Sequence, residues 1–296
     1  MGKSEGVSQT SELPTPAHVG RCGLGPGVGP SAGNIVRWLR TAFSFFGLLL
    51  AACPAEHETP PVVLKPPEWQ DGETSVYDII RNDSVLYRLT SQVRFDEELL
   101  QPAGSSRSVV PTIRLITVVE TVSADEYFAD SAVVVMRRDN LEPLRSARVL
   151  ETAIAVFDLE AEYAPGRVTV TKRSIDGTQM QVLPIPARAY DNEMISFVLR
   201  ALPLVPATTL SFATVVPMDM RVLPVKVKVL GTKVVTTGLG DIMCREVSLR
   251  MLRRQTRFWY ELAEPHRLAG LANPESKTEL RLVSYQASST ATDTVR

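Results

Sequence analysis

Alternation of apolar and polar residues with a period of two dominates this chain. In PVKVKVLG, Val225, Val227 and Val229 alternate with Lys226 and Lys228. Successive side chains of a β-strand point to opposite faces of a sheet, so this pattern predicts a strand with one buried face. Similar runs recur along the chain and are separated by short turns. The sequence therefore predicts a mainly β domain built as an antiparallel meander.

The segment GRVTVTKRSIDGTQMQVL shows how such strands connect. Val168 and Val170 alternate with threonines, and Asp176 and Gly177 supply turn chemistry before the next alternating run. We expect a β-hairpin here. No segment of helical length separates neighbouring strands, which disfavours parallel βαβ units and nucleotide-binding α/β folds. The glycines of TTGLGD accordingly read as turn or bulge residues rather than as a phosphate-binding loop.

One segment, YDNEMISFVLRALPLVP, departs from the alternation. Asp191 is placed to cap a helix and Pro203 to end it, which predicts a helix over 191–202. The residues of its apolar face are Met194, Ile195, Val198, Leu199 and Leu202. A single amphipathic helix among many strands needs an apolar surface, and the concave side of a curved sheet provides one. We therefore expect a curved antiparallel sheet or half-barrel with one packed α-helix.

The run FSFFGLLLAAC, which ends at Cys53, predicts export. Arg37 and Arg40 form a positive region, residues 42–50 an apolar region, and small residues precede the cysteine. The apolar run is much shorter than the roughly 20 residues that cross a bilayer as a permanent helix. A buried core helix with an inert thiol at Cys53 is the alternative interpretation.

Leu-Ala-Ala-Cys resembles the bacterial lipobox, in which the cysteine receives a diacylglyceryl group and the chain is cut just before it. The resemblance implies a mature protein that begins at Cys53 and is held to a membrane by lipid. Pro54 follows the cysteine where an Asp would resemble the inner-membrane retention signal. In a host with two membranes, we expect this lipoprotein in the outer membrane, facing the periplasm.

Composition along the chain divides it into five parts. Residues 1–34 are rich in Gly, Ser and Pro and predict either a disordered extension or a translation start placed too early. A lipoprotein signal peptide at 35–52 and a Pro-rich tether at 53–71 follow. The β-rich domain is expected over 72–286, with a frayed tail at 287–296.

Charge and cysteine content exclude several partners. The net charge is −1 and 44% of the residues are hydrophobic, which is ordinary for a globular protein and unlike a nucleic-acid-binding one. With Cys22 removed by processing and Cys53 lipidated, Cys244 has no disulfide partner. Cys244 alternates in phase with Ile242, which predicts a buried, inert thiol; a reactive thiol is the alternative.

The residue inventory disfavours catalysis. After processing only His57 and His266 remain, and His57 falls in the tether. A Ser-His-Asp or Cys-His site would have to use His266, whose context EPHRLAG predicts a turn between strands. Neither a zinc-like cysteine pair nor a histidine cluster is present. We predict no catalytic residue, no metal site, no cofactor and no enzyme activity.

Several stretches together resemble a bacterial family of exported β-rich domains known as domain of unknown function 3108. They are Gly72-Glu73 with Tyr77, DNEMISFVLRALPL, VKVLGTKVVTTGLGDIMCREVSL, FWYELAEPHRLAG and TELRLVSY, from Gly72 to about Tyr285. By analogy with the lipoprotein carriers LolA, LolB and LppX, the resemblance implies an open β half-barrel around an apolar cavity. Those carriers have several helices where this chain has one.

Three functions fit these features. The first is a binding or carrier module for a lipid or acyl chain, with Met194, Val198, Leu202 and Trp259 as candidate contacts. Trp259 lies between Phe258 and Tyr260, so it faces either a rim of the core or a ligand-facing groove. The second is a lipoprotein that docks other envelope proteins along sheet edges. The third is a hydrolase. We predict the first, a membrane-anchored and non-enzymatic binding protein, and make no prediction of oligomeric state.

Overall fold

The computed structural model describes residues 64, 69–100, 107–122 and 127–287. Residues 58–296 form one compact unit with its own hydrophobic core, as expected of a segment that folds on its own. Its elements are β1 (Thr74–Arg81), β2 (Ser84–Leu100), β3 (Ser108–Thr121), β4 (Phe128–Arg137), β5 (Pro143–Thr152), β6 (Val156–Ala164), β7 (Arg167–Ser174), β8 (Gly177–Pro184), β9 (Ala189–Asp191), η1 (Asn192–Met194), α1 (Ile195–Arg200), β10 (Thr209–Val216), η2 (Pro217–Asp219), β11 (Arg221–Thr237), β12 (Gly240–Met251), β13 (Arg254–Glu261), β14 (Leu268–Asn273) and β15 (Thr278–Gln286).

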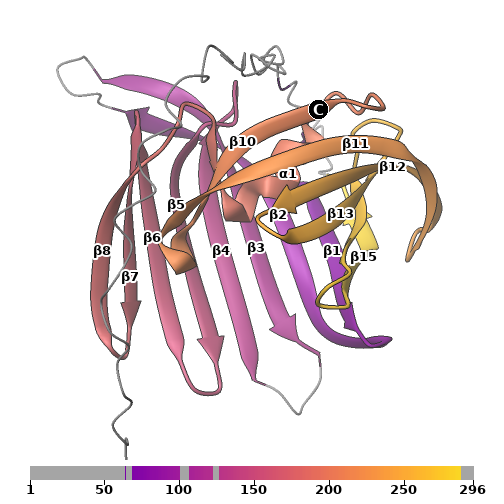
Figure 1. Ribbon diagram of the computed structural model, residues 1–296, viewed down its shortest axis with the longest axis horizontal. Coiled ribbons are helices and arrows are strands. Elements are labelled where there is room, and N and C mark those ends of the chain that lie inside the picture. The colour runs from indigo at the N-terminus through magenta and orange to yellow at the C-terminus, as the bar shows by residue number, and fades with distance from the viewer. Residues whose placement is uncertain (1–63, 65–68, 101–106, 123–126, 288–296) are drawn as a thin grey trace, which may run out of the picture. The chain divides into compact units, whose positions relative to one another are not determined.

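These strands form one 15-stranded open sheet in the order β8-β7-β6-β5-β4-β3-β2-β1-β15-β14-β13-β12-β11-β10-β9. The chain thus makes two meanders, β1 to β8 and β9 to β15, which join where β1 pairs with β15 (Figure 1). The strand pairs are antiparallel, except that β9 runs parallel to β10. The prediction of a curved antiparallel meander with one packed helix is confirmed.

Local patterns in the sequence account for the strands. On β11, Val225, Val227 and Val229 are buried while Lys226 and Lys228 are exposed. β7 and β8 form the expected hairpin, closed by Ser174 opposite Gly177. Gly177 has a φ of 120°, which favours a residue without a side chain. Alternation and turn chemistry therefore predict both the strands and their connections.

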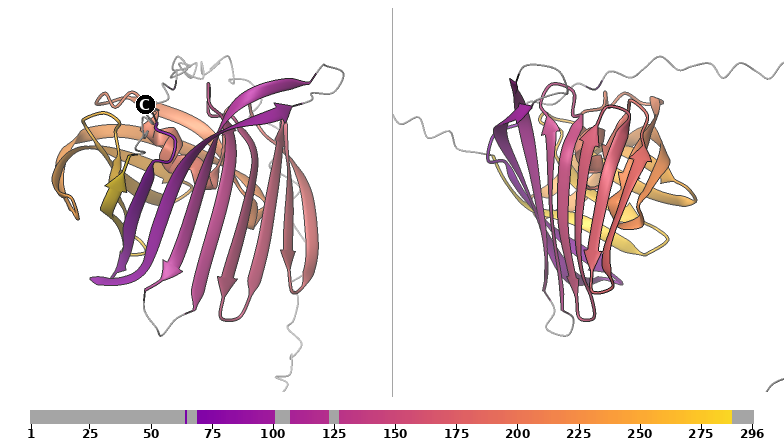
Figure 2. Two further views of the ribbon diagram at one scale, coloured as in Figure 1. Left: turned by 180° about the vertical axis from the view of Figure 1, so that it is seen from behind. Right: turned by 90° about the vertical axis from the view of Figure 1, so that its left-hand side faces the viewer.

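The sheet curls so that its two ends face each other without joining (Figures 1 and 2). A small apolar cluster links Val168 and Val170 of β7 to Val215 of β10. Lys172 of β7 also donates a hydrogen bond of 3.2 Å to the carbonyl oxygen of Met218 in η2. Side chains, rather than a strand ladder, thus hold the ends together, and β8 and β9 are the edges of the sheet.

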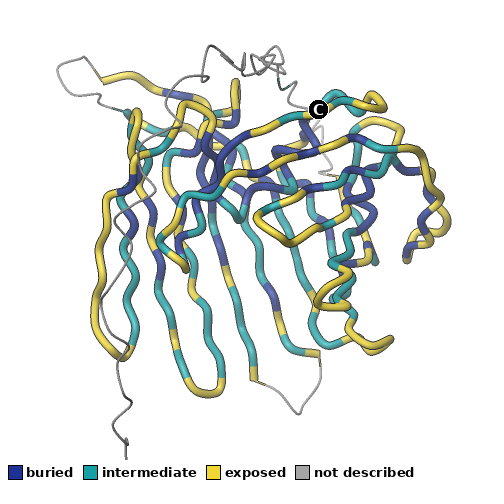
Figure 3. Tube along the Cα trace, viewed as in Figure 1, coloured by how far each residue is buried: buried dark blue, intermediate teal, exposed yellow. Residues whose placement is uncertain are grey.

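Helix α1 lies inside the curl, against the larger of the two apolar clusters (Figures 1 and 3). The prediction of a helix over 191–202 is correct in place but too long. A 3-10 turn precedes it, α1 ends at Arg200, and Ala201 is its C-cap. Pro203 follows closely, and the residue before a proline disfavours helical geometry. Asp191 caps the 3-10 turn by accepting a hydrogen bond from the backbone N–H of Glu193.

Several predictions fall outside the described residues. They are the extension at 1–34, the signal peptide at 35–52, the lipidation site Cys53, His57 and most of the tether. Every strand of the described part lies within the predicted domain 72–286. None of the helices described there is long and apolar enough to cross a membrane.

Candidate ligand-binding hollow

A hollow of about 180 Å³ lies between α1 and the concave face of the sheet, and we call it the inner hollow. Its apolar wall includes Leu89, Val93, Val119, Phe197, Leu271 and Leu280. Alternation places Leu89 and Val93 of β2 on the same face, because side chains two residues apart along a strand share a face. The wall is therefore a direct product of the strand pattern.

An ion pair lines the hollow at the end of α1. Arg200, the last residue of the helix, bonds both carboxylate oxygens of Glu73 at 2.5 and 3.2 Å, and its Nε donates to the carbonyl oxygen of Pro265 at 2.8 Å. Both charged side chains are almost fully buried, at 6% and 3% exposure. A buried charge requires such compensation, because an unpaired charge is very unfavourable in an apolar interior.

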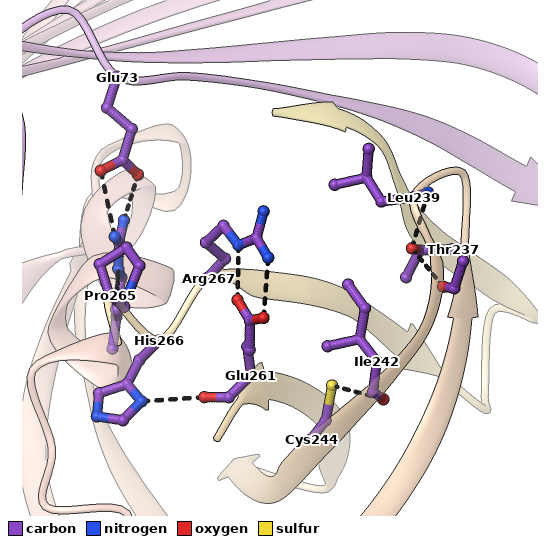
Figure 4. Close-up of polar contacts among 11 residues, drawn as sticks. Glu73, Thr237, Leu239, Ile242, Cys244, Glu261, Pro265, His266 and Arg267 are labelled. Carbon is purple, nitrogen blue, oxygen red and sulfur yellow. Dashed lines mark hydrogen bonds and ion pairs between the residues drawn. The ribbon is translucent and has the colours of Figure 1, made fainter. Parts of the chain in front are cut away.

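A second arginine borders the same hollow. Arg267 donates from Nε and from a terminal nitrogen to the two carboxylate oxygens of Glu261, at 2.6 and 2.8 Å (Figure 4). Its guanidinium lies 4.7 Å from the ring centre of Tyr285, and the Glu261 pair raises the pKa of Arg267. Arg267 is half-buried and paired with Glu261. It can therefore bind a ligand only while it also bonds Glu261.

Two tyrosines place neutral hydroxyls at the wall. Burial raises the pKa of Tyr77 to about 12 and raises that of Tyr260 well above the ordinary value. The Tyr260 hydroxyl donates to the carbonyl oxygen of Ser196 in α1 at 2.7 Å. Both phenols therefore stay protonated at neutral pH and act as hydrogen-bonding groups rather than as bases.

A buried carboxylate holds the start of the helical segment. Asp191 accepts hydrogen bonds from the Ser146 hydroxyl at 2.5 Å, from the Tyr163 hydroxyl at 2.7 Å and from the Glu193 backbone N–H at 2.9 Å. Burial raises the pKa of Asp191, and the three donors oppose that rise. β5 and β6 supply the hydroxyls, so this carboxylate connects the helix to the first meander.

Glu193 and Asp130 bring further negative charge to the inner hollow. Arg148 bonds Glu193 at 2.7 Å and both carboxylate oxygens of Asp130 at 2.8 and 2.7 Å. Burial raises the pKa of Glu193, and the charge of Arg148 opposes this shift. The polar side of the hollow thus carries paired charges of both signs.

A second hollow, of about 230 Å³, adjoins the first. Its apolar wall includes Val225, Leu249, Met251 and Phe258 from the second meander. It shares Glu193, Ser196 and Leu271 with the inner hollow. The two spaces therefore meet near the start of α1.

The residues proposed from the sequence as ligand contacts lie in the core. Met194 and Val198 are fully buried and Leu202 is 4% exposed, and none of the three lines the two hollows just described. Trp259 also lines neither hollow; it is 7% exposed, and the Lys233 ammonium lies 4.6 Å from its ring centre. The structure places Met194, Val198, Leu202 and Trp259 in the same apolar cluster. Binding at these residues stays a prediction.

Cys244 and His266 lie where the sequence places them. Cys244 is a free, fully buried cysteine, and burial raises its pKa to about 11. Its thiol donates to the carbonyl oxygen of Ile242 at 3.4 Å (Figure 4). His266 lies in the turn before β14, with Nδ1 3.0 Å from the carbonyl oxygen of Glu261. Within the described residues, no group of three or more His, Cys, Asp or Glu side chains is arranged to hold a metal ion.

The charged residues around α1 were not selected from the sequence. Arg200 offered one signal, since it is the single charge in the otherwise apolar stretch SFVLRALPLVP. Such a charge on a buried helix requires a partner. The sequence around Arg200 does not indicate which residue is its partner, because Glu73 is 127 residues away.

Two solved structures resemble this chain weakly. A crystal structure of a beta-barrel-like protein of domain of unknown function DUF1849 from Brucella abortus is 11% identical, with a TM-score of 0.45, and the match covers 75% of this chain and all of that one. A protein with a YmcC-like fold from Bacteroides fragilis is 10% identical, with a TM-score of 0.32, over 76% of this chain and 99% of the other. The finer resemblance to LolA, LolB and LppX stays a prediction. No curated protein sequence matches.

The family assignment rests on the larger part of the domain. The model of the family described as protein of unknown function DUF3108 matches residues 92–269. This match includes α1, the β11–β12 hairpin and most of FWYELAEPHRLAG, but neither Gly72-Glu73 nor TELRLVSY. The chain therefore belongs to the DUF3108 family.

Proposed function

We propose that this domain binds a small apolar or amphipathic molecule in the inner hollow and performs no reaction on it. The observation that carries the proposal is the space of about 180 Å³ between α1 and the concave face of the sheet. Its wall combines aliphatic side chains with neutral hydroxyls and paired charges. Such a combination is typical of ligand pockets, which use few polar groups to orient a largely apolar ligand.

The size of the hollow limits the ligand. Typical pockets for small molecules measure roughly 300–1,000 Å³, and an apolar cavity of about 150 Å³ admits a molecule as small as benzene. The inner hollow therefore suits one short apolar group or the end of a single acyl chain. Each buried methylene contributes about 0.8 kcal/mol, so a few suffice for measurable affinity when the site is already formed.

A substitution that fills the hollow tests this proposal. Ser91 lines the hollow on β2, and Ser91→Leu replaces its hydroxyl by three carbon atoms without introducing a charge. Thr90→Leu is the matched control, because the neighbouring side chain points to the other face. Native mass spectrometry of residues 58–296 with a short-chain fatty acid or lysophospholipid measures the bound fraction.

Ligand bound by wild type and Thr90→Leu, but lost in a folded Ser91→Leu protein, supports the proposal. A wild-type domain that binds none of these probes, or a Ser91→Leu protein that binds them equally well, contradicts it. Charged substitutions at Val198 or Leu202 would not test the proposal, because a charge at these buried core positions would unfold the domain.

We propose further that a lipid at Cys53 anchors this domain to the outer membrane. The lipobox-like Leu-Ala-Ala-Cys and the Pro-rich tether support this part. Intact-mass analysis of membrane-extracted protein is expected to show a diacylglyceryl-modified N-terminal Cys53. Any other mature N-terminus, or an unmodified Cys53, contradicts the anchor. Membrane fractionation tests the outer-membrane location.

Edge strand β8 favours a second candidate function, the docking of another envelope protein. Only Leu183 of its eight residues is buried, and Met180 and Val182 are 72% and 57% exposed. The strand carries no charge, although lysines commonly protect exposed edges. Stoichiometric capture of one envelope protein that Met180→Lys abolishes, in a domain that binds no lipid probe, would support docking instead.

A further inference from the structure

Basic residues gather on the face of the second meander that points away from α1. Lys226 and Lys228 of β11 are exposed, while the valines between them are buried toward the helix. Arg250 of β12 pairs directly with Lys226, and Arg257 of β13 pairs with Ser248 beside Lys228. Strand register therefore places these four side chains on one continuous surface.

The turn between β12 and β13 extends this surface. Arg253 is exposed in the turn. Together we call the five residues the basic patch: Lys226, Lys228, Arg250, Arg253 and Arg257. Within the described part of the chain only Arg257 has a carboxylate partner, Glu246 at 3.1 Å. The patch thus concentrates positive charge in a protein whose net charge is −1.

Pairing Lys226 with Arg250 is unfavourable for the isolated domain. Like charges directly opposite each other on neighbouring strands destabilise a sheet. Several other surface arginines, in contrast, have a carboxylate within 4 Å, as Arg88, Arg114 and Arg173 do. An arrangement that repels itself in the free protein becomes favourable when an anionic surface covers it.

An exposed apolar residue lies at the tip of the same hairpin. Leu252 is 63% exposed and has a φ of 55°, in the left-handed region that non-glycine residues seldom adopt. Arg250, Arg253 and Arg254 surround it in the sequence. A soluble partner would have to supply a pocket for this leucine, whereas a lipid surface offers both phosphate groups for the arginines and an apolar layer just beneath.

We propose that the β12–β13 hairpin binds a membrane surface containing anionic phospholipids, with the basic patch on the headgroups and Leu252 inserted between them. This contact is separate from the ligand proposed for the inner hollow, because the patch lies on the opposite face of the sheet. It also does not depend on Cys53, although a lipid-anchored domain would remain close to such a surface.

Vesicle co-sedimentation of residues 58–296 tests the proposal. The probes are vesicles of phosphatidylcholine alone and vesicles with about one third phosphatidylglycerol. Binding is expected with the anionic vesicles only and is expected to weaken as salt rises. Neutralising three residues of the basic patch, in Lys228→Gln/Arg250→Gln/Arg253→Gln, is expected to lower the partition coefficient about 100-fold, at roughly fivefold per basic residue.

A second triple variant controls for net charge. Arg81, Arg167 and Arg188 are exposed arginines outside the patch, and neutralising them removes the same total charge. This control is expected to bind anionic vesicles within a few-fold of wild type. Leu252→Ser is expected to lower binding while leaving its salt dependence unchanged, because it removes only the apolar contact.

Three results would overturn the proposal. They are absence of binding to anionic vesicles, equal binding to both vesicle types, and equal losses in the two triple variants. Circular dichroism of each variant establishes that it is folded, and each substituted side chain is exposed, so the fold is expected to persist.

Discussion

The two ends of the helical segment are both fastened by buried carboxylates, but in different ways. At the start, Asp191 receives two hydroxyl groups and one backbone N–H. At the end, Arg200 forms an ion pair with Glu73 and also donates to a backbone carbonyl. A helix of six residues is unstable by itself, so these contacts and the apolar core must hold it in place.

The difference between the two ends has an electrostatic consequence. Neutral donors only partly replace the water around a carboxylate, and the pKa of Asp191 is raised by burial. An ion pair instead keeps two opposite charges together inside the protein, and removal of either one leaves the other without compensation. We therefore expect the end of the helix to be sensitive to charge removal and the start to be sensitive to pH.

Removal of Glu73 is expected to have the largest effect. Glu73→Ala leaves the Arg200 guanidinium buried without a counter-ion, which lowers the free energy of unfolding by about 3–5 kcal/mol. Urea unfolding followed by circular dichroism measures the change. A loss below about 1 kcal/mol would show that water compensates Arg200 and would contradict the buried ion pair.

The double variant Glu73→Leu/Arg200→Met sharpens this comparison. Replacing both members of a buried ion pair by apolar residues of similar size is often neutral or stabilising. Most of the lost stability is therefore expected to return. A small deficit of about 1 kcal/mol is expected to remain, because the carbonyl oxygen of Pro265 loses the Arg200 donor.

The contrast also explains which features could be predicted from the sequence. The strands could be predicted because alternation is local: Val225 and Val227 report a buried face wherever their strand lies. The Asp191 cap was equally local. The Glu73–Arg200 pair, and the hollow it lines, depend on the pairing of strands distant in the chain, which has no local signature. The six apolar residues of the inner wall named above lie on five different elements, so no single segment reveals them.

Removal of Asp191 is expected to have the next largest effect. Asp191→Ala removes the cap of the helical segment, at about 1 kcal/mol, and leaves the Ser146 and Tyr163 hydroxyls without their acceptor. A combined loss of about 2–4 kcal/mol is expected in urea unfolding. Ser146→Ala is the matched control and should cost about 1 kcal/mol, since Tyr163 and the backbone N–H keep their acceptor. Equal losses in the two variants would contradict a central role for the carboxylate.

The dependence of stability on pH is expected to distinguish the two ends. Because the pKa of Asp191 is raised in the folded state, the folded protein binds more protons than the unfolded chain above the unfolded pKa of about 3.9. The contribution of Asp191 to the free energy of unfolding is therefore largest at low pH, and it declines as pH rises through the pKa of Asp191 in the folded protein. Unfolding free energies of wild type and Asp191→Asn, measured from about pH 4 to pH 8, should show a smaller decline in the variant. A variant whose pH profile has the same slope as wild type would contradict the raised pKa.

The smallest effect is expected at the middle of the helix, where Tyr260 fastens α1 with a neutral hydrogen bond. Tyr260→Phe removes the donor to the carbonyl oxygen of Ser196 but keeps the ring, which stacks on Phe258 at 6.3 Å. The carbonyl of a helical residue retains its place in the helix ladder, so a loss of only about 0.5–1.5 kcal/mol is expected.

Tyr127→Phe is the matched control for this last change, because its hydroxyl bonds Glu151 at the same 2.7 Å in an exposed position. That variant is expected to be neutral, since water replaces the lost partner on the surface. If Tyr260→Phe lowered the free energy of unfolding as much as Glu73→Ala, the helix would depend on this neutral hydrogen bond as strongly as on its buried ion pair. The proposed difference between charged and neutral contacts would then be wrong. The expected order, with Glu73→Ala far above Tyr260→Phe and Tyr127→Phe near zero, follows from how much desolvated charge each substitution leaves without a partner.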